Sequence, residues 1–202
     1  ASAEVQGCQS KGVNCYVKHF AVNEQETHRN GGCSWVTEQA MRELYLRPFE
    51  MTVKIGKTKT MMSSFNRIGT RWTGGDYRLL TEILRNEWGF KGTVISDYNE
   101  NSAYMDAKQM IYAGGDLNLC SNKARMWSDY DSSSASDVTM LRNAAKNVLY
   151  TTMNRNMEKI FNPMDFPQEE KKEMKANCEN VILRFPQEMA YRIYDEFEVD
   201  EI

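Results

Sequence analysis

A carboxylate follows directly on a short apolar run near the middle of the chain. Residues Thr93–Ile95 are β-branched or apolar, and Ser96 and Asp97 come next. Turn-forming residues before the run and a polar segment after it are typical of the boundaries of a buried strand. Because the catalytic groups of an α/β barrel lie at the carboxyl ends of its strands, Asp97 is a candidate catalytic group. On the pattern alone, however, a turn or a helix N-cap explains an aspartate in this place better.

A basic pair closes an earlier predicted strand. The segment Val13–Phe20 favours β-structure and contains Lys18 and His19 near its end. A lysine ammonium can donate hydrogen bonds and bring positive charge beside a carboxylate, and an imidazole can hydrogen-bond a hydroxyl group. Taken alone, the two residues are explained as well by a surface ion pair and a buried structural histidine.

Strands and helices alternate over the first three quarters of the chain. Two more strands are predicted at Thr60–Phe65 and Asp116–Leu119. The predicted helices are Trp35–Lys54 with a cap at Ser34 and a kink at Pro48, Leu79–Trp88 with a cap at Asp76, Ser102–Tyr112, and Asp137–Met153. This order predicts an α/β fold with parallel strands, either about four units of a partial (β/α)8 barrel or a small doubly wound sheet. Neither a G-x-G-x-x-G motif nor a P-loop occurs, which argues against nucleotide binding.

The composition argues against several classes of protein. The chain of 202 residues has a net charge of −3 and no block of Lys and Arg, which argues against a nucleic-acid partner. No apolar run approaches the ~20 residues of a membrane span, and the first residues of the sequence do not have the pattern of a secretory signal. Five scattered cysteines and two histidines predict reduced thiols, no metal site, no cofactor and a cytoplasmic protein.

The last part of the chain, residues 158–202, has a different composition. It holds twelve acidic and six basic residues, a net charge of −6. Pro167 and Pro186 each precede a helix-forming run, which predicts helices at Gln168–Leu183 and Gln187–Phe197. We therefore expect two parts, residues 1–157 and an acidic helical tail over 158–202. A solvated appendage is the simplest interpretation of the tail, and a partner-binding segment is the alternative.

Several motifs resemble those of the β-glucosidases of glycoside hydrolase family 3. Lys18–Arg29 resembles the signature K-H-F-x-x-N-x-x-E-x-x-R, and Met62–Asn66 resembles M-x-S-[YF]-N. Other segments resemble the family in the same order, namely Glu38–Glu50, Leu84–Gly92 leading into Val94–Tyr98, and Ala113–Leu117. The resemblance covers about residues 10–155 and does not include the tail. It implies the C-terminal half of the family's (β/α)8 barrel.

The resemblance implies roles for the residues at the strand ends. Asp97 corresponds to the nucleophile of a retaining hydrolase, which attacks the anomeric carbon while a second group ~5–5.5 Å away donates a proton. Lys18 and His19 correspond to residues that hold the sugar beside the bond to be broken. In the family the acid/base glutamate usually comes from a separate α/β sandwich domain, which is not among these residues.

Three further residues are weaker candidates for sugar contacts. Tyr98 either borders the sugar or packs at the barrel mouth, and Met62 is better explained by packing. Phe65 stands where many family members have a tyrosine, so it lacks a hydroxyl for a hydrogen bond. Glu26 and His28 resemble a catalytic Asp-x-His pair of the family's N-acetylglucosaminidases, but the rest of that loop is absent here. We expect Glu26 to brace the loop instead.

The resemblance thus implies a β-glucosidase-like enzyme that hydrolyses terminal β-D-glucosyl residues of a β-glucoside or an oligosaccharide. It would need the other barrel half and the sandwich domain as partners, so we expect these 202 residues alone to be inactive. The alternative is a non-catalytic interaction protein that derives from a truncated hydrolase and uses the acidic tail.

Overall fold

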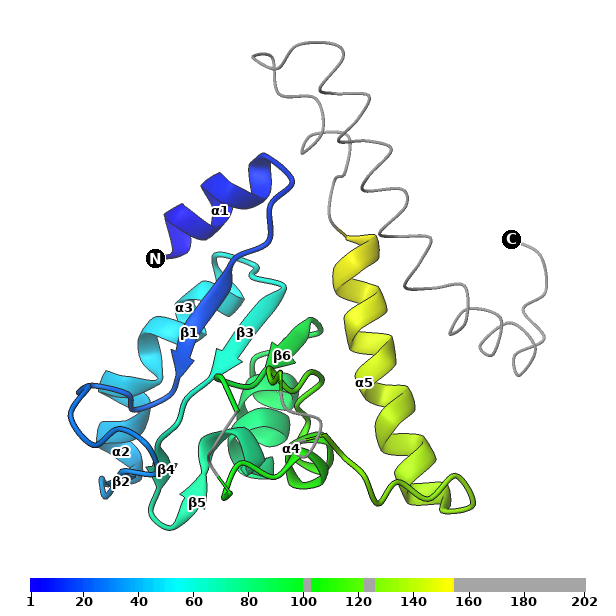
Figure 1. Cartoon of the computed structure of the whole chain (residues 1–202). Coiled ribbons are helices and arrows are strands. Elements are labelled where there is room, and N and C mark those ends of the chain that lie inside the picture. Colours follow the sequence, from blue (N-terminus) through cyan, green and yellow to red (C-terminus); the bar gives the residue numbers. More distant parts are fainter. Residues whose placement is uncertain (100–102, 122–125, 155–202) are drawn as a thin grey trace. The chain divides into compact units, whose positions relative to one another are not determined.

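The computed structural model describes residues 1–99, 103–121 and 126–154 (Figure 1). The chain divides into two units, Ala1–Asn156 and Met157–Ile202. The second unit, and with it both helices predicted in the tail, lies outside the described residues. The predicted division of the chain into residues 1–157 and 158–202 stays a prediction.

Three parallel strands form the main sheet, in the spatial order β1-β3-β6 (Figure 1). The strands are β1 (Tyr16–Phe20), β3 (Thr60–Ser63) and β6 (Thr93–Ile95). Thr60 lies opposite both Tyr16 and Thr93, so the strands begin at one level and their carboxyl ends meet at one edge. The predicted α/β fold with a parallel sheet is confirmed, and the described strands do not close into a barrel.

The fourth predicted strand, Asp116–Leu119, is reduced to one parallel bridge between Ile95 and Leu117. A side chain interrupts the ladder here. The amide of Val94 donates to the carboxylate of Asp116 at 2.6 Å, so it is not available to a neighbouring backbone carbonyl. The Val94 carbonyl still accepts the amides of Asp116 and Leu117, which keeps this segment against β6.

Helices connect and flank the strands. They are α1 (Ser2–Ser10), α2 (Glu38–Ala40), η1 (Met41–Tyr45), α3 (Arg47–Lys54), η3 (Arg78–Glu87), α4 (Ala107–Ala113) and α5 (Ala135–Met153), with a short turn η2 (Thr73–Gly75). The helix predicted over Trp35–Lys54 begins only at Glu38. Its cap is Thr37, whose hydroxyl accepts the Ala40 amide at 3.3 Å, and the predicted cap Ser34 lies in a strand instead.

Side-chain caps also set the starts of two later helices. The carboxylate of Asp76 accepts the amides of Arg78 at 3.0 Å and Leu79 at 3.4 Å, which confirms it as the cap of the helix that begins at Tyr77 and continues as η3. The helix predicted at Ser102–Tyr112 corresponds to α4, which begins at Ala107. There the carboxylate of Asp106 accepts the Gln109 amide at 2.6 Å and caps α4.

A second, small sheet was not predicted from the sequence. It consists of β2 (Cys33–Ser34), β4 (Arg67–Ile68) and β5 (Arg71–Trp72). Strand β2 pairs with β4 in parallel, and β4 pairs with β5 in antiparallel fashion. It ties the loop that follows β1 to the loop that follows β3, so both loops at the edge of the main sheet are fixed together.

The main core lies between the sheet and the helices that follow β1 and β3. Phe20, Met61 and Val94, one from each strand, are at most 1% exposed and pack in one cluster with Leu46 and Leu84. A second cluster lies around α4 and consists of Phe65, Trp72, Met105, Met110, Ile111 and Ala144. Burial of these side chains holds the strand ends in a fixed relation to one another.

The turn before β6 has no room for a side chain. A Cβ added to Gly92 would lie 1.9 Å from the carbonyl oxygen of Lys59. We therefore expect Gly92→Ala to lower the free energy of unfolding by about 2–3 kcal/mol, because the two strands would have to separate. Gly7→Ala is the control, since nothing lies within 4 Å of its added Cβ and alanine favours helix α1. Urea unfolding of both variants measures the difference, and an unchanged Gly92→Ala midpoint would contradict the packing.

Candidate active site

The structure brings the candidate residues of two strands together at the carboxyl edge of the sheet. Asp97 follows β6 by two residues and is only 7% exposed. His19 lies in β1, and its Nε2 is 3.4 Å from Oδ2 of Asp97. Folding thus places an imidazole and a carboxylate from distant parts of the sequence side by side.

The two oxygens of Asp97 have different surroundings. Oδ1 accepts the amide of Tyr98 at 2.7 Å. Oδ2 is buried and has no hydrogen-bond partner among the described residues, and its contact with His19 is longer than a well-formed hydrogen bond. Asp97 is not a helix cap, because the next described helix, α4, is capped by Asp106. A buried carboxylate oxygen without a close donor is available to a ligand.

His19 is held by its neighbours in a neutral form. Asn23 places its Nδ2 3.3 Å from Nδ1 of the ring. Burial lowers the pKa of His19 below its usual value, and the nearby cations Lys18 and Arg29 lower it further, although Asp97 opposes them. At neutral pH the ring is therefore an uncharged imidazole with one donor and one acceptor nitrogen.

The other predicted site residues lie in less definite positions. Lys18 is exposed on β1 and forms no ion pair within 4 Å with a described residue. Tyr98 is 44% exposed, and its hydroxyl lies 2.9 Å from that of Ser121. Met62 is half-buried in β3, and Phe65 is buried in the second core cluster. Contact of any of these side chains with a sugar stays a prediction.

Sequence reasoning missed several polar groups at the same edge of the sheet. Asn23, Ser63, Asn66 and Asn99 follow or end the three strands, and each has a buried oxygen without a hydrogen-bond partner in the described structure. Buried polar atoms in proteins are almost always paired, so each of these oxygens calls for a partner such as a water molecule or a bound ligand. The signal in the sequence is an amide or a hydroxyl just after an apolar strand, which is also common in ordinary turns.

A second buried carboxylate beside β6, that of Asp116, has a structural function. Asp116 Oδ2 lies 2.7 Å from Nη2 of Arg85, and Oδ1 accepts the side-chain amide of Asn147 at 2.8 Å. Loss of hydration on burial raises the pKa of the Asp116 carboxyl to about 6, against the opposing effect of Arg85. Both of its oxygens are occupied by protein groups, in contrast to Oδ2 of Asp97.

The loop after β1 is braced by charge. Glu26 and Arg29 form an ion pair at 3.0 Å, which confirms the predicted bracing. The guanidinium of Arg29 lies 4.7 Å from the centre of the Phe65 ring, so this cation also packs against the second core cluster. Arg29 therefore links the loop after β1 to the residue that follows β3.

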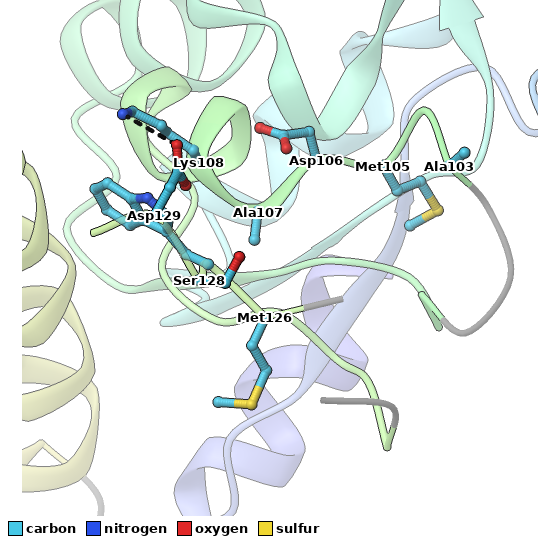
Figure 2. Close-up of a pocket in the computed structure, with 9 residues that line it drawn as sticks. Ala103, Met105, Asp106, Ala107, Lys108, Met126, Ser128 and Asp129 are labelled. Atoms are coloured by element: carbon cyan, nitrogen blue, oxygen red, sulfur yellow. Dashed lines mark ion pairs between the residues drawn. The ribbon is translucent and has the colours of Figure 1, made fainter. Parts of the chain in front are cut away.

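A pocket separate from these residues lies beside α4 (Figure 2). It is lined by Ala103, Met105, Asp106, Ala107, Lys108, Met126, Trp127, Ser128 and Asp129. Lys108 and Asp129 form an ion pair of 3.6 Å at its rim (Figure 2), and the Lys108 ammonium lies 5.5 Å from the centre of the Trp127 ring. Neither Asp97 nor His19 lines this pocket.

The described residues contain no group of three or more His, Cys, Asp or Glu side chains arranged to hold a metal ion. The four cysteines among them, Cys8, Cys15, Cys33 and Cys120, are free thiols. Within the part of the chain that the structure describes, no helix is both long and apolar enough to cross a bilayer.

A parallel sheet flanked by helices, with a buried carboxylate at its carboxyl edge, defines the class of this domain as α/β. The family follows from the sequence. Residues 1–155 match the N-terminal domain of glycosyl hydrolase family 3, so the chain belongs to this family. The predicted resemblance to family 3 β-glucosidases is confirmed.

The similar proteins are much longer than this chain. A β-glucosidase of Rhizobium radiobacter is 42% identical over 119 residues, which are 59% of this chain and 14% of the relative. A β-glucosidase of Ruminococcus albus is 41% identical over 101 residues, which are 50% of this chain and 11% of the relative. The chain thus spans about one seventh or less of the length of these curated relatives.

Solved structures of the family share the fold. β-Glucosidase 3B of Thermotoga neapolitana in complex with glucose matches with a TM-score of 0.68 and 32% identity, over 85% of this chain and 25% of that one. The family 3 β-glucosidase of Bifidobacterium adolescentis matches with a TM-score of 0.69 and 28% identity, over 85% and 25% of the two chains.

Proposed function

We propose that this chain supplies the nucleophile of a retaining β-glucosidase, and that Asp97 is this nucleophile. One observation carries the proposal. Oδ2 of Asp97 is buried, has no hydrogen-bond partner among the described residues and lies 3.4 Å from a neutral imidazole. Family membership supports the reaction class, and the relatives named β-glucosidase support a β-glucoside as substrate.

The reaction follows from the chemistry of a buried carboxylate. Oδ2 of Asp97 attacks the anomeric carbon, the bond from that carbon to the leaving oxygen breaks, and a general acid outside these residues protonates this oxygen. The product is a glycosyl ester on Asp97. The same external group then takes a proton from water, whose oxygen attacks the anomeric carbon and releases the Asp97 carboxylate. Both steps invert the anomeric carbon, so the sugar keeps its original configuration.

The surrounding residues hold the sugar during both steps. Lys18 can hydrogen-bond its hydroxyl groups, and so can Nε2 of His19, whose 3.4 Å contact with Asp97 is too long for a strong hydrogen bond. Tyr98 borders the sugar, and Met62 and Phe65 shape the base of the site. The unpaired oxygens of the neighbouring Asn and Ser side chains give further partners for sugar hydroxyls. These contacts need no metal ion or cofactor.

The sheet corresponds in this proposal to the second half of a (β/α)8 barrel. Its unclosed edges are where the first half would pair, and a sandwich domain would bring the acid/base glutamate. The expectation of a cytoplasmic location rests on the free cysteines and stays a prediction.

The 202 residues alone are expected to release no measurable product from an aryl β-glucoside, because the proton donor lies elsewhere. A chimaera in which residues 1–155 replace the matched segment of the Thermotoga neapolitana enzyme is expected to be active. A 2-deoxy-2-fluoro-β-glucoside should then label the chimaera by one sugar, and peptide mass spectrometry should locate the label on Asp97.

Two results would contradict the proposal. Robust turnover by the 202 residues alone would show that they already hold an acid/base group. A correctly folded chimaera that is neither active nor labelled would favour the alternative, a non-catalytic interaction protein.

A further inference from the structure

We propose that Asn23 is a positioning residue that fixes the tautomer of His19, so that Nε2 carries the proton and donates it toward Asp97. Asn23 lies three residues after the end of β1, and its Nδ2 is 3.3 Å from Nδ1 of His19. The other ring nitrogen, Nε2, is 3.4 Å from Oδ2 of Asp97. The imidazole thus lies between an amide on one side and a carboxylate on the other.

The two contacts are compatible with only one neutral tautomer. A neutral imidazole has one N–H donor and one acceptor nitrogen. If the Asn23 amide nitrogen donates to Nδ1, the proton of His19 is on Nε2 and faces the carboxylate. The opposite tautomer would set two N–H groups against each other at Nδ1 and would point the Nε2 lone pair at Oδ2 of Asp97.

The orientation of the Asn23 amide determines whether Nδ1 of His19 accepts or donates a hydrogen bond. The oxygen and nitrogen of an asparagine are assigned from their hydrogen bonds. With the amide reversed, Oδ1 would accept from Nδ1–H, and Nε2 would become an acceptor directed at an acceptor. The orientation with Nδ2 toward Nδ1 avoids this repulsion, although it leaves Oδ1 of Asn23 buried without a described partner.

The charges around His19 make its tautomer relevant, because a doubly protonated ring has no tautomers. Asp97 and Glu26 favour the charged ring, whereas Lys18 and Arg29 disfavour it. Burial is the largest effect and also disfavours the charged ring, so the pKa of His19 is lowered. The ring at neutral pH is uncharged, and Asn23 selects which nitrogen carries the proton.

The consequence for catalysis rests on the proposed function of Asp97. A neutral N–H at 3.4 Å donates only weakly to the carboxylate, whereas an imidazolium would form a strong ion pair and make the nucleophile less reactive. Asn23 therefore determines that the neutral ring presents an N–H, and not a lone pair, to Oδ2 of Asp97.

The test uses the whole 202-residue chain and needs no sugar. The chain has only two histidines, so a ¹⁵N-histidine NMR spectrum at neutral pH contains two rings, and His28→Gln identifies the signals of His19. A protonated and an unprotonated ring nitrogen differ greatly in ¹⁵N chemical shift. We expect a protonated Nε2 and an unprotonated Nδ1 in the wild-type protein.

Two variants sharpen the test. In Asn23→Asp a carboxylate faces Nδ1, so Nδ1 is expected to become protonated and the titration of His19 to move to higher pH. In Asn23→Leu the donor to Nδ1 is lost, so the Nδ1-protonated tautomer is expected to gain population and both nitrogen shifts to move toward intermediate values. Asn30→Asp is the matched control, since it adds the same charge at an exposed position of the same loop and should leave His19 unchanged.

A wild-type spectrum with the proton on Nδ1 would overturn the inference even if every variant failed to fold. Folded Asn23 variants with unchanged His19 shifts would overturn it as well. The result is separable from the proposed function, because the tautomer is read without turnover. If the tautomer is as expected but no label forms on Asp97, the proposed function fails and the role of Asn23 in orienting the ring stands.

Discussion

Replacing Asp97 by asparagine is expected to lower the turnover of an aryl β-glucoside by about 10⁴-fold or more in the chimaera that contains residues 1–155. Asparagine has nearly the same shape as aspartate, but its neutral amide oxygen cannot form a stable ester with the anomeric carbon. Labelling by the fluoroglucoside should be lost in the same variant. Steady-state kinetics and mass spectrometry of one protein preparation measure both effects.

The control is the same substitution at another aspartate. Asp106 caps α4 from an exposed position, and asparagine caps a helix about as well as aspartate does. Asp106→Asn should therefore keep the turnover of the parent chimaera. An Asp97→Asn protein that keeps more than a tenth of the parent turnover would exclude the nucleophile role.

A small anion can separate loss of the nucleophile from loss of structure. Asp97→Ala leaves a gap on the face of the sugar from which the carboxylate would attack. Added azide is expected to restore turnover with an aryl β-glucoside, and the product should be the α-glucosyl azide, because only one displacement takes place. A misfolded variant would not be rescued, and a residue that merely supports the site would give β-configured glucose.

The elements that the sequence predicts well are those with a local cause. The β-branched run Thr93–Ile95 forms a strand whose first two residues are buried, and Pro48 lies in the first turn of α3 because its ring fits there. The meeting of His19 and Asp97 was also predictable, since the carboxyl ends of parallel strands share one edge of the sheet.

The features that escaped prediction depend on partners far away in the sequence. The two-residue strands β2, β4 and β5 have no apolar period, and they exist only because their loops lie side by side. Asp97 follows the end of one predicted strand and Asp116 opens another, and the sequence does not show which of the two carboxylates is paired. Only the folded structure shows that Arg85 and Asn147 occupy the oxygens of Asp116, whereas one oxygen of Asp97 is unpaired.

Arg85 is expected to stabilise the fold more than any exposed cation of the described chain. Its side chain is 14% exposed, pairs with Asp116 at 2.7 Å and donates to the carbonyls of Gly92 and Gly114. Removing one partner of a buried pair leaves the other charged and unsolvated, so Arg85→Leu should lower the free energy of unfolding by about 3–5 kcal/mol at pH 7. Urea unfolding of the 202-residue chain measures this value.

Arg42 provides a matched control because it makes more ion pairs in a more exposed place. It contacts Glu87 at 2.8 Å and Glu38 at 2.9 Å, but its side chain is 39% exposed. Ion pairs on the surface contribute at most about 1 kcal/mol, since water and salt screen them. Arg42→Leu should therefore cost far less than Arg85→Leu. Equal losses would mean that burial does not determine the contribution of these pairs.

The dependence on pH tests whether the loss at Arg85 comes from the charge of Asp116. In the wild type the pKa of Asp116 is raised from 3.8 to about 6, so the folded state binds more protons than the unfolded state between these values, and the free energy of unfolding falls as the pH rises through them. Without Arg85 the pKa of Asp116 should rise further and extend this fall to higher pH. The penalty of Arg85→Leu should therefore be small at pH 4, where Asp116 is protonated in both folded proteins, and largest at neutral pH. A penalty that is the same at both pH values would instead assign the loss to the lost hydrogen bonds with Gly92 and Gly114.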